Sequence, residues 1–179
     1  MFTEFTVNII LIGFMGSGKS TVAKSLSTLL DRPWIEMDDL VYKKTNTQNM
    51  DEVFEKGGEL LLRETEIAIA KEYILEKNLV ISTGGGVVLN KIILDHFKKM
   101  GGKVIFLQAS FDTIRKRLEE NTSRPLFKHL TDSKKLYDFR LPLYLNYADK
   151  VIDVNALSAD NIALKIKELL QEENLLSAF

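Results

Sequence analysis

Short runs of hydrophobic residues alternate with longer amphipathic stretches along most of the chain. The runs carry few polar positions, which is typical of strands that are buried on both faces. They predict strands at residues 7–12, 33–37, 79–82, 104–107 and 150–154. Because helical stretches separate the strands, the pattern predicts an α/β fold in three layers, with a parallel sheet between two layers of helices.

Hydrophobic positions repeat with the helical period between the expected strands. The first such stretch follows the strand at 7–12 and carries Val22, Leu26, Leu29 and Leu30. Further helices are predicted at residues 59–76, 91–99, 112–120, 134–147 and 159–170. Residues 121–133 lack a sustained period and are rich in polar residues, so they predict a loop or lid. The 179 residues, 45% of them hydrophobic, are expected to form one domain spanning 1–179.

A glycine-rich segment connects the first predicted strand to the first predicted helix. Residues 13–20 read Gly-Phe-Met-Gly-Ser-Gly-Lys-Ser and match the G-x-x-x-x-G-K-S/T pattern of phosphate-binding loops. Glycines let consecutive backbone N–H groups turn towards phosphate oxygens, and the following helix directs its positive end at the same charge. The residues expected to bind a nucleoside triphosphate are Gly16, Ser17, Gly18, Lys19, Ser20 and Thr21, with Lys19 on the β- and γ-phosphates and Ser20 on Mg²⁺.

Composition narrows the class of partner. The chain has 24 Lys and Arg against 25 Asp and Glu, which argues against broad neutralisation of nucleic-acid phosphates. There is no cysteine, and the two histidines, His96 and His129, are far apart, so Mg²⁺ held by oxygen is the expected metal. Residues 1–6 lack the features of a signal peptide, and no hydrophobic stretch approaches the ~20 residues that span a bilayer. We expect a soluble, cytoplasmic monomer that binds neither nucleic acid nor membrane.

The phosphate-binding loop alone defines a very large class of proteins. A GTPase is expected to carry Asn-Lys-x-Asp, whereas Asn90 and Lys91 are followed by two isoleucines, and no Asp-x-x-Gly switch is present. Arginine is scarce, at 6 of the 24 cations, and Arg63, Arg124 and Arg140 stand in distinctive contexts. Guanidinium groups bind carboxylate or phosphate through paired hydrogen bonds, so these three favour an anionic substrate. For any one of them, a surface ion pair is the alternative.

Over residues 7–170 the sequence resembles the shikimate kinases. The matching motifs, in order and at appropriate spacing, are the phosphate-binding loop, Glu36-Met37-Asp38, Gly58-Glu59 with Arg63 and Glu66, Ser82-Thr83-Gly84-Gly85-Gly86, residues 121–126 and residues 140–144. The resemblance implies transfer of the γ-phosphoryl group of ATP to the 3-hydroxyl of shikimate, on the pathway to aromatic amino acids. It also implies the fold of nucleoside monophosphate kinases, with a five-stranded parallel sheet, a substrate-binding segment at about 38–66 and a lid at about 121–133.

The resemblance further implies roles for individual residues. Asp38 would hydrogen-bond the acceptor hydroxyl, and Arg63 and Arg140 would bind the shikimate carboxylate. Gly85, between Gly84 and Gly86, would offer its backbone N–H to the substrate. The remaining implied roles are those of Arg124, which would reach the phosphates from the lid, Arg117, which would lie over the adenine, and Glu36, which would reach Mg²⁺ through water.

The positions of these residues support the same roles, with alternatives. Asp38 directly follows a predicted strand, at the carboxyl edge where parallel sheets bind ligands, but it could also cap a helix that starts near Asp39. Two residues depart from the family pattern: Glu36 stands where Asp is common, and Leu62 where an aromatic residue often precedes the arginine. A kinase of the same fold acting on gluconate or a nucleoside monophosphate, and a nucleotide-binding regulator without turnover, remain open alternatives.

Overall fold

The computed structural model describes residues 7–73, 75–119 and 130–173. Within them, five parallel strands form one sheet in the order β2-β3-β1-β4-β5. The strands are β1 (Ile9–Ile12), β2 (Trp34–Glu36), β3 (Val80–Ser82), β4 (Lys103–Gln108) and β5 (Lys150–Asp153). The predicted parallel sheet is therefore confirmed, and each predicted strand segment overlaps one of its strands, although β4 extends one residue beyond the predicted segment 104–107 at each end.

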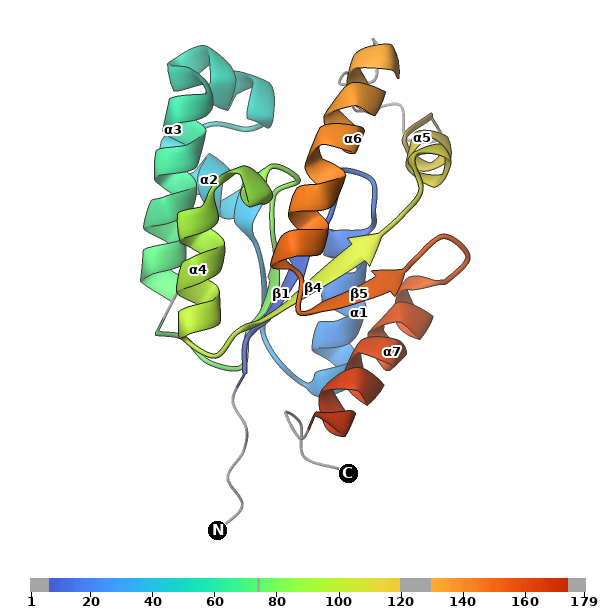
Figure 1. The fold of residues 1–179 in the computed structure, drawn as a ribbon. Coiled ribbons are helices and arrows are strands. Elements are labelled where there is room, and N and C mark those ends of the chain that lie inside the picture. The colour runs from blue at the N-terminus through green and yellow to red at the C-terminus, as the bar shows by residue number, and fades with distance from the viewer. Residues whose placement is uncertain (1–6, 74, 120–129, 174–179) are drawn as a thin grey trace.

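Helices cover both faces of the sheet (Figure 1). Helices α1 (Lys19–Leu30) and α7 (Ala159–Glu172) pack against each other on one face. On the opposite face, in front of the sheet in Figure 1, α4 (Lys91–Lys99) and α6 (Leu130–Tyr147) pack against β4. The remaining elements are α2 (Met37–Thr45), α3 (Met50–Tyr73), the short 3-10 helix η1 (Val87–Leu89) and α5 (Phe111–Glu119).

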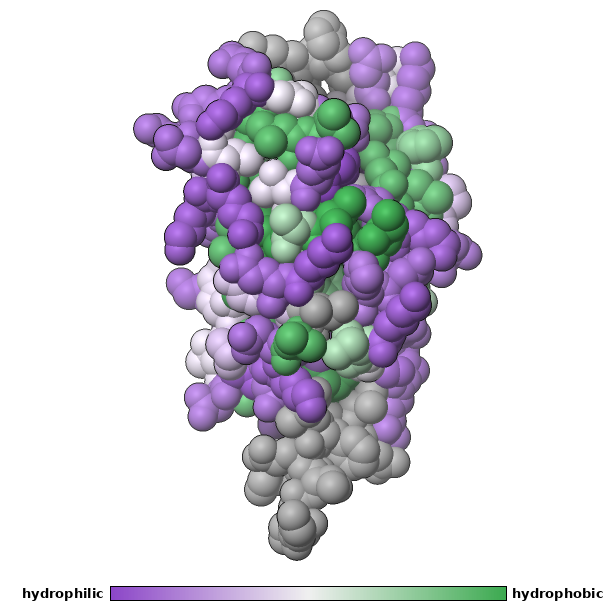
Figure 2. Space-filling view, turned by 90° about the vertical axis from the view of Figure 1, so that its left-hand side faces the viewer, coloured by the Kyte–Doolittle hydropathy of each residue, from purple (hydrophilic) through white to green (hydrophobic). Residues whose placement is uncertain are grey.

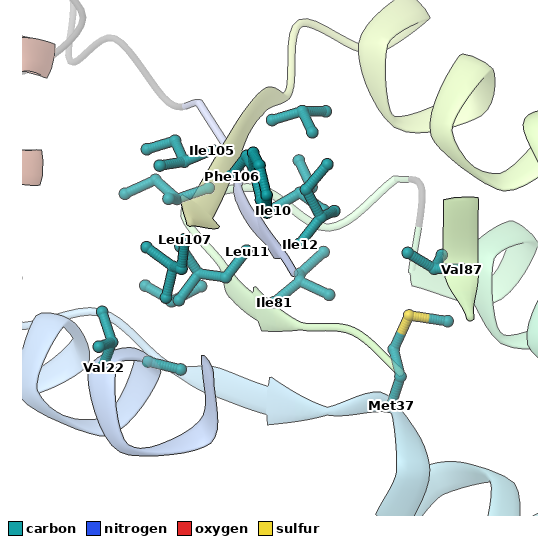
Figure 3. Packing of buried hydrophobic residues seen from close by; sticks show 14 of the residues in the cluster. Ile10, Leu11, Ile12, Val22, Met37, Ile81, Val87, Ile105, Phe106 and Leu107 are labelled. Carbon is teal, nitrogen blue, oxygen red and sulfur yellow. The ribbon is translucent and has the colours of Figure 1, made fainter. Parts of the chain in front are cut away.

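The core is centred on β1 and β4, whose neighbouring residues are hydrophobic on both faces (Figure 3). All four residues of β1 are fully buried, and the register places Leu11 beside Ile105 and Ile12 beside Phe106. Helices cover both sides of a parallel strand, so a polar side chain on either face of β1 would be buried away from water. Each fully buried Leu or Ile stabilises the fold by roughly 1.5–3 kcal/mol. The loop after β1 therefore leaves from a fully buried strand in the middle of the sheet.

The second strand is shorter than the sequence predicts. Residues 33–37 were expected to be extended, but β2 ends at Glu36 and Met37 already begins α2. Met37 is fully buried as a helical residue, and Asp38 and Asp39 lie in the first turn of α2. Acidic residues are favourable at that end of a helix because they face its positive pole. The run of hydrophobic residues therefore crosses a strand–helix boundary that the periodicity does not reveal.

Helix α3 differs most from the prediction. The sequence predicts a helix at 59–76, whereas α3 begins at Met50 and includes a non-helical residue, Gly58, with φ 64° and ψ −160°. The consecutive glycines Gly57 and Gly58 indicate a break, and the break is real, but helical structure continues on both sides of it. Buried contacts of Val53 before the break hold the first part in place. Such tertiary packing is not visible in local propensity.

The predicted lid at 121–133 overlaps a helix. Residues 121–129 lie outside the described residues, but α6 begins at Leu130, so the prediction is wrong for 130–133. Asp132 lies in the first turn of α6, and the hydroxyl-bearing Ser133 is buried. Polar residues at the start of a helix resemble a loop when only composition is considered. The predicted start of this helix at residue 134 is therefore one turn too late.

The outer surface of α3 and α4 is mainly hydrophilic (Figure 2). The figure shows the left-hand side of Figure 1, where smaller hydrophobic areas interrupt the polar surface. The inward residues of α4, Ile93, Leu94 and Phe97, are buried instead.

Among the described residues, no helix is both long and apolar enough to cross a membrane.

Candidate active site

The phosphate-binding loop joins β1 to α1 at the carboxyl end of the central strand. Gly16 (φ 77°) and Gly18 (φ 95°) adopt left-handed conformations that residues with a Cβ rarely take. Gly18 is also the N-cap of α1, where no side chain hydrogen-bonds the first turn. The N–H groups of that turn are therefore available to an anion, which the positive end of the helix also attracts.

Lys19 places its ammonium over this loop. Its Nζ donates hydrogen bonds to the carbonyl oxygens of Gly13 (2.8 Å) and Phe14 (3.1 Å), and the residue is only 8% exposed. A charge held in so little water binds phosphate more strongly than an exposed lysine does. Ser20 and Thr21 continue the same helical turn on its exposed side.

Two carboxylates stand at the end of β2. Glu36 is the last residue of β2 and the N-cap of α2, and Asp38 follows inside the first turn of the helix. The alternative of Asp38 as the cap of a helix starting near Asp39 is wrong, because the helix starts at Met37. In the sheet, Glu36 pairs with Ser82 at the end of β3. The carboxylates therefore lie at the same edge as the phosphate-binding loop.

The environment of Glu36 disfavours its charge. Burial raises the pKa of this carboxyl, and the hydroxyls of Ser20 and Ser82 lower it only in part. The nearby charge of Asp38 adds to the rise, whereas Lys19 opposes it. The oxygen Oε2 of Glu36 is buried and lacks a hydrogen-bond partner among the described residues. An orphaned oxygen of this kind indicates that a cation or water belongs beside Glu36.

The oxygen groups at this edge fit a hydrated Mg²⁺ ion. Mg²⁺ prefers hard oxygen ligands, keeps several waters and completes its octahedron with substrate phosphates. Ser20 offers a hydroxyl, and Glu36 offers an unpartnered carboxylate oxygen. In the described part of the chain, no group of three His, Cys, Asp or Glu side chains forms a protein cage for a metal. The roles of Ser20 and Glu36 towards Mg²⁺ stay predictions.

Arg63 approaches this edge from α3, held by two carboxylates. Its Nη1 donates to Oε2 of Glu66 at 2.7 Å, and its Nε and Nη2 donate to Oε1 of Glu59 at 3.3 and 3.1 Å. Burial raises the pKa of the Glu66 carboxyl, an effect that the ion pair with Arg63 offsets only in part. Glu66 was part of the recognised motif, but its role as the buried anchor of Arg63 is visible only in the structure.

The three glycines after β3 let side chains approach their backbone closely. A Cβ on Gly84 would lie 2.9 Å from Oδ1 of Asp38, and one on Gly86 would clash with Nη2 of Arg63. A Cβ on Gly85 would lie 3.1 Å from the backbone nitrogen of Met15 in the phosphate-binding loop. The glycine loop, residues 84–86, therefore brings the phosphate-binding loop, Asp38 and Arg63 together.

Arg140 and Tyr144 of α6 meet this glycine loop from the opposite side. Arg140 donates from Nη1 to the carbonyl oxygen of Gly85 at 3.3 Å, and the hydroxyl of Tyr144 donates to the same oxygen. Burial lowers the pKa of Arg140, and its Nε is buried without a partner among the described residues. The guanidinium also lies over the ring of Phe14, 5.9 Å from its centroid. The carbonyl of Gly85 is thus engaged, and the use of its N–H by a substrate stays a prediction.

Arg117 lies at the other end of the site. It donates from Nη1 to the carbonyl oxygens of Gly16 (3.4 Å) and Ser17 (3.2 Å), and from Nη2 to that of Val154 (2.9 Å). These bonds tie the phosphate-binding loop to the end of β5. They position the guanidinium at the edge of the cavity, and its expected place over the adenine stays a prediction.

These groups surround one cavity of about 1020 Å³. The predicted site residues that line it are Gly16, Ser17, Gly18, Lys19, Ser20, Thr21, Glu36, Asp38, Arg63, Gly84, Gly85, Gly86, Arg117 and Arg140. The structure therefore brings together the predicted site residues that it describes. Arg124 lies outside the described residues, so its expected contact with the phosphates stays a prediction.

The structure adds lining residues that the sequence motifs do not name. Tyr42, Asn49, Met50, Asp51 and Phe54 lie inside the predicted substrate-binding segment at about 38–66 and line the side formed by α2, α3 and the turn between them. Further parts of the cavity are lined by Leu118, Leu136, Leu157, Ala159 and Ile162. In the loop after β5, Asn155 accepts hydrogen bonds from the backbone N–H of Ser110 and the hydroxyl of Thr113, which sets the loop against α5. The added residues line the cavity because segments that are distant in the sequence meet there, which the hydrophobic pattern of the chain does not reveal.

Comparison with known proteins agrees with this geometry. The family model described as shikimate kinase matches residues 15–171. A shikimate kinase of Francisella tularensis subsp. holarctica is 36% identical over 177 residues, covering 96% of this chain and 98% of the relative. One from Caldicellulosiruptor bescii is 38% identical over 162 residues, covering 89% of this chain and 92% of the relative.

Solved structures give the same result. Shikimate kinase from Acinetobacter baumannii in complex with shikimate has a TM-score of 0.85 at 33% identity, covering 96% of this chain and 97% of that chain. The enzyme from Aquifex aeolicus has a TM-score of 0.79 at 32% identity, covering 94% and 99%. A gluconokinase from Sinorhizobium meliloti, at 17% identity and a TM-score of 0.56, shares only the fold. The protein described here belongs to the shikimate kinase family.

Proposed function

We propose that this protein transfers the γ-phosphoryl group of ATP to the 3-hydroxyl of shikimate. One observation carries the proposal: Asp38, Arg63 and Arg140 line the same cavity as the phosphate-binding loop. Shikimate is a small carboxylate with hydroxyl groups, so its site needs cations for the carboxylate and an acceptor for a hydroxyl proton. The three side chains supply these groups beside a loop that is built for phosphate.

The proposed mechanism relies on positioning and charge. Lys19 and the N–H groups of the loop would bind the phosphates, and Arg63 and Arg140 would hold the acceptor by its carboxylate. Asp38 would orient the acceptor hydroxyl and take its proton as the new P–O bond forms. Mg²⁺, held by Ser20 and through water by Glu36, would offset charge on the phosphates. Because phosphoryl transfer passes through a loose transition state, strong base catalysis by Asp38 is not required.

Further parts of the proposal concern the lid, the oligomeric state and the cellular location. Arg124 would reach the phosphates when the segment around it closes, which would exclude water from bound ATP. We also propose that the enzyme is a monomer. The cytoplasm is the proposed location because it supplies ATP.

The test is ADP release with Mg²⁺ and ATP in the presence of shikimate, gluconate or a nucleoside monophosphate. We expect release that depends on shikimate, and a fall of at least about a hundredfold in Lys19→Met, because a phosphate ligand of this kind is worth several kcal/mol in the transition state. Lys24→Met is the matched control, since Lys24 is exposed on the same helix. Release with another acceptor would show a different kinase, and ATP binding without acceptor-dependent release would show a regulator.

A further inference from the structure

The two carboxylates that hold Arg63 do so unequally. The Glu66 contact is a single short hydrogen bond of 2.7 Å to a side chain that is 2% exposed. The Glu59 contact shares one oxygen between two donors at 3.1 and 3.3 Å, and this side chain is 59% exposed. Exposed pairs within a helix are weak, whereas breaking a buried pair is costly. Glu66 therefore anchors Arg63, and Glu59 is held loosely.

Glu59 occupies the edge of Arg63 that suits an external carboxylate. Nε and Nη2 form the fork that binds a carboxylate through two parallel hydrogen bonds, one to each oxygen. A single oxygen shared by both donors does not form this parallel pair. Gly86 lies against Nη2, so this edge adjoins the glycine loop of the acceptor pocket. Arg140, across that loop, keeps a buried Nε without a partner among the described residues. A ligand carboxylate between Arg63 and Arg140 would thus need donors that Glu59 now uses.

Glu59 is close to both arginines and stands at a break in the backbone. The Glu59 carboxylate pairs with Arg63. Its negative charge also offsets part of the effect by which burial lowers the pKa of Arg140. It directly follows Gly58, whose φ of 64° interrupts α3, and no atom lies within 4 Å of the place of a Cβ on Gly58. The Glu59 side chain is itself 59% exposed, so it can leave Arg63 for solvent without repacking the helix.

We propose that Glu59 is an internal competitor for the carboxylate of the acceptor. In the free enzyme it occupies the Nε–Nη2 edge of Arg63, and it leaves when the acceptor carboxylate binds there. The inference rests on the proposed function in one respect, that the acceptor is a carboxylate. Its consequence is selectivity, because a carboxylate bound by both arginines displaces Glu59, whereas a neutral polyol has no charge with which to do so.

The experiment compares Glu59→Gln with Glu64→Gln, which removes the same charge from an exposed position further along α3. Isothermal titration without ATP measures the Kd of shikimate and of 1-cyclohexene-1-carboxylate, a probe that keeps the carboxylate and lacks the hydroxyls. We expect Glu59→Gln to lower both Kd values about two- to fivefold, the range set by an exposed ion pair, and Glu64→Gln to leave them unchanged.

Several outcomes would overturn the inference. These are an unchanged or higher Kd in Glu59→Gln, an equal fall in Glu64→Gln, or a parent that binds neither carboxylate. A purely structural role would lower Tm in Glu59→Gln without tightening either ligand. Failure of the proposed function looks different: the parent would release no ADP with shikimate, while the Kd of the carboxylate probe would still fall in Glu59→Gln.

Discussion

Individual residues of this site fall into two groups according to where their hydrogen bonds go. Lys19 and Glu66 already have close protein partners, at 2.8 and 2.7 Å, and these partners fix their direction. Glu36 and Arg140 each keep a buried polar atom without a partner among the described residues. Because an unpaired buried polar atom costs about 1–3 kcal/mol, such atoms point to ligands that the folded protein is arranged to bind.

Arg140→Lys should raise the KM for shikimate about ten- to a hundredfold. An ammonium presents a point charge instead of a planar fork, and the loss of one charge-assisted hydrogen bond costs roughly 1.5–3 kcal/mol. Steady-state ADP release against shikimate concentration measures the effect. Arg115→Lys is the matched control, because Arg115 pairs only loosely with Glu119 at 3.9 Å and lies on α5. If both variants behave like the parent, the carboxylate site has been misplaced.

Substitutions of Asp38 and Glu36 should have different kinetic effects, although the two residues are only two positions apart. Asp38→Asn cannot take the hydroxyl proton, so it should lower the maximal rate at every Mg²⁺ concentration. Glu36→Gln should mainly raise the Mg²⁺ concentration that gives half-maximal rate, because a ligand acting through water affects metal occupancy first. Titration of Mg²⁺ at saturating ATP and shikimate measures both. Rescue of Asp38→Asn by Mg²⁺, with Glu36→Gln unaffected by it, would reverse the two assignments.

At the scale of elements, the site depends on how α6 meets the loop after β3. The ring of Tyr144 stacks on Phe106 of β4, with centroids 5.0 Å apart, and its hydroxyl donates to the carbonyl oxygen of Gly85. Helix α6 contains Pro142 and yet continues to Tyr147, so packing against the sheet outweighs the lost backbone hydrogen bond. The helix thereby fixes the peptide of Gly85 between the phosphate-binding loop and Arg140.

Tyr144→Phe should impair the acceptor site more than the fold. The ring and its stacking remain, so we expect a loss of about 1 kcal/mol in the free energy of unfolding, the usual value of one hydrogen bond. The KM for shikimate should rise several-fold while the KM for ATP changes little, because the Gly85 peptide loses one of its two donors. Tyr147→Phe, in the same helix, is the control. Equal changes in the two KM values would indicate a general loss of structure instead.

For the molecule as a whole, the site concentrates charge at one edge of an otherwise hydrophobic sheet. The core strands end there, and the carboxyls of Glu36 and Glu66 are both buried enough to have raised pKa values. A carboxyl whose folded-state pKa is raised stabilises the protein fully only below its unfolded value, near 4.5. As pH rises through the folded-state pKa, that contribution is lost.

Glu36→Gln should therefore be more stable than the parent at pH 8, with the difference shrinking towards pH 4.5. The parent must ionise a buried carboxyl in this range, whereas the amide stays neutral. Urea unfolding in EDTA, at several pH values, measures the free energy of unfolding of each protein. Glu119→Gln, at an exposed position on α5, should show no such trend. A stability difference independent of pH would contradict the raised pKa of Glu36.

Much of the architecture follows from local sequence. Uniformly hydrophobic segments such as the one containing β1 predict strands buried on both faces, because each residue there must avoid water on either side. The phosphate-binding loop is equally local, since its glycines, Lys19 and Ser20 act within one turn of chain. The sequence by itself thus determined the parallel sheet, the kind of ligand at its edge and the residues of the motifs.

Other features depend on segments that are distant in sequence. The contact of Tyr144 with Gly85 and the bonds from Arg117 to Ser17 and Val154 arise when strands pair and helices pack. The start of α3 before Gly58 is likewise held by burial, which local propensity does not contain. Only the tertiary structure could decide which donors are already used and which remain for a ligand, because hydrogen-bond partners are fixed by side-chain direction and burial.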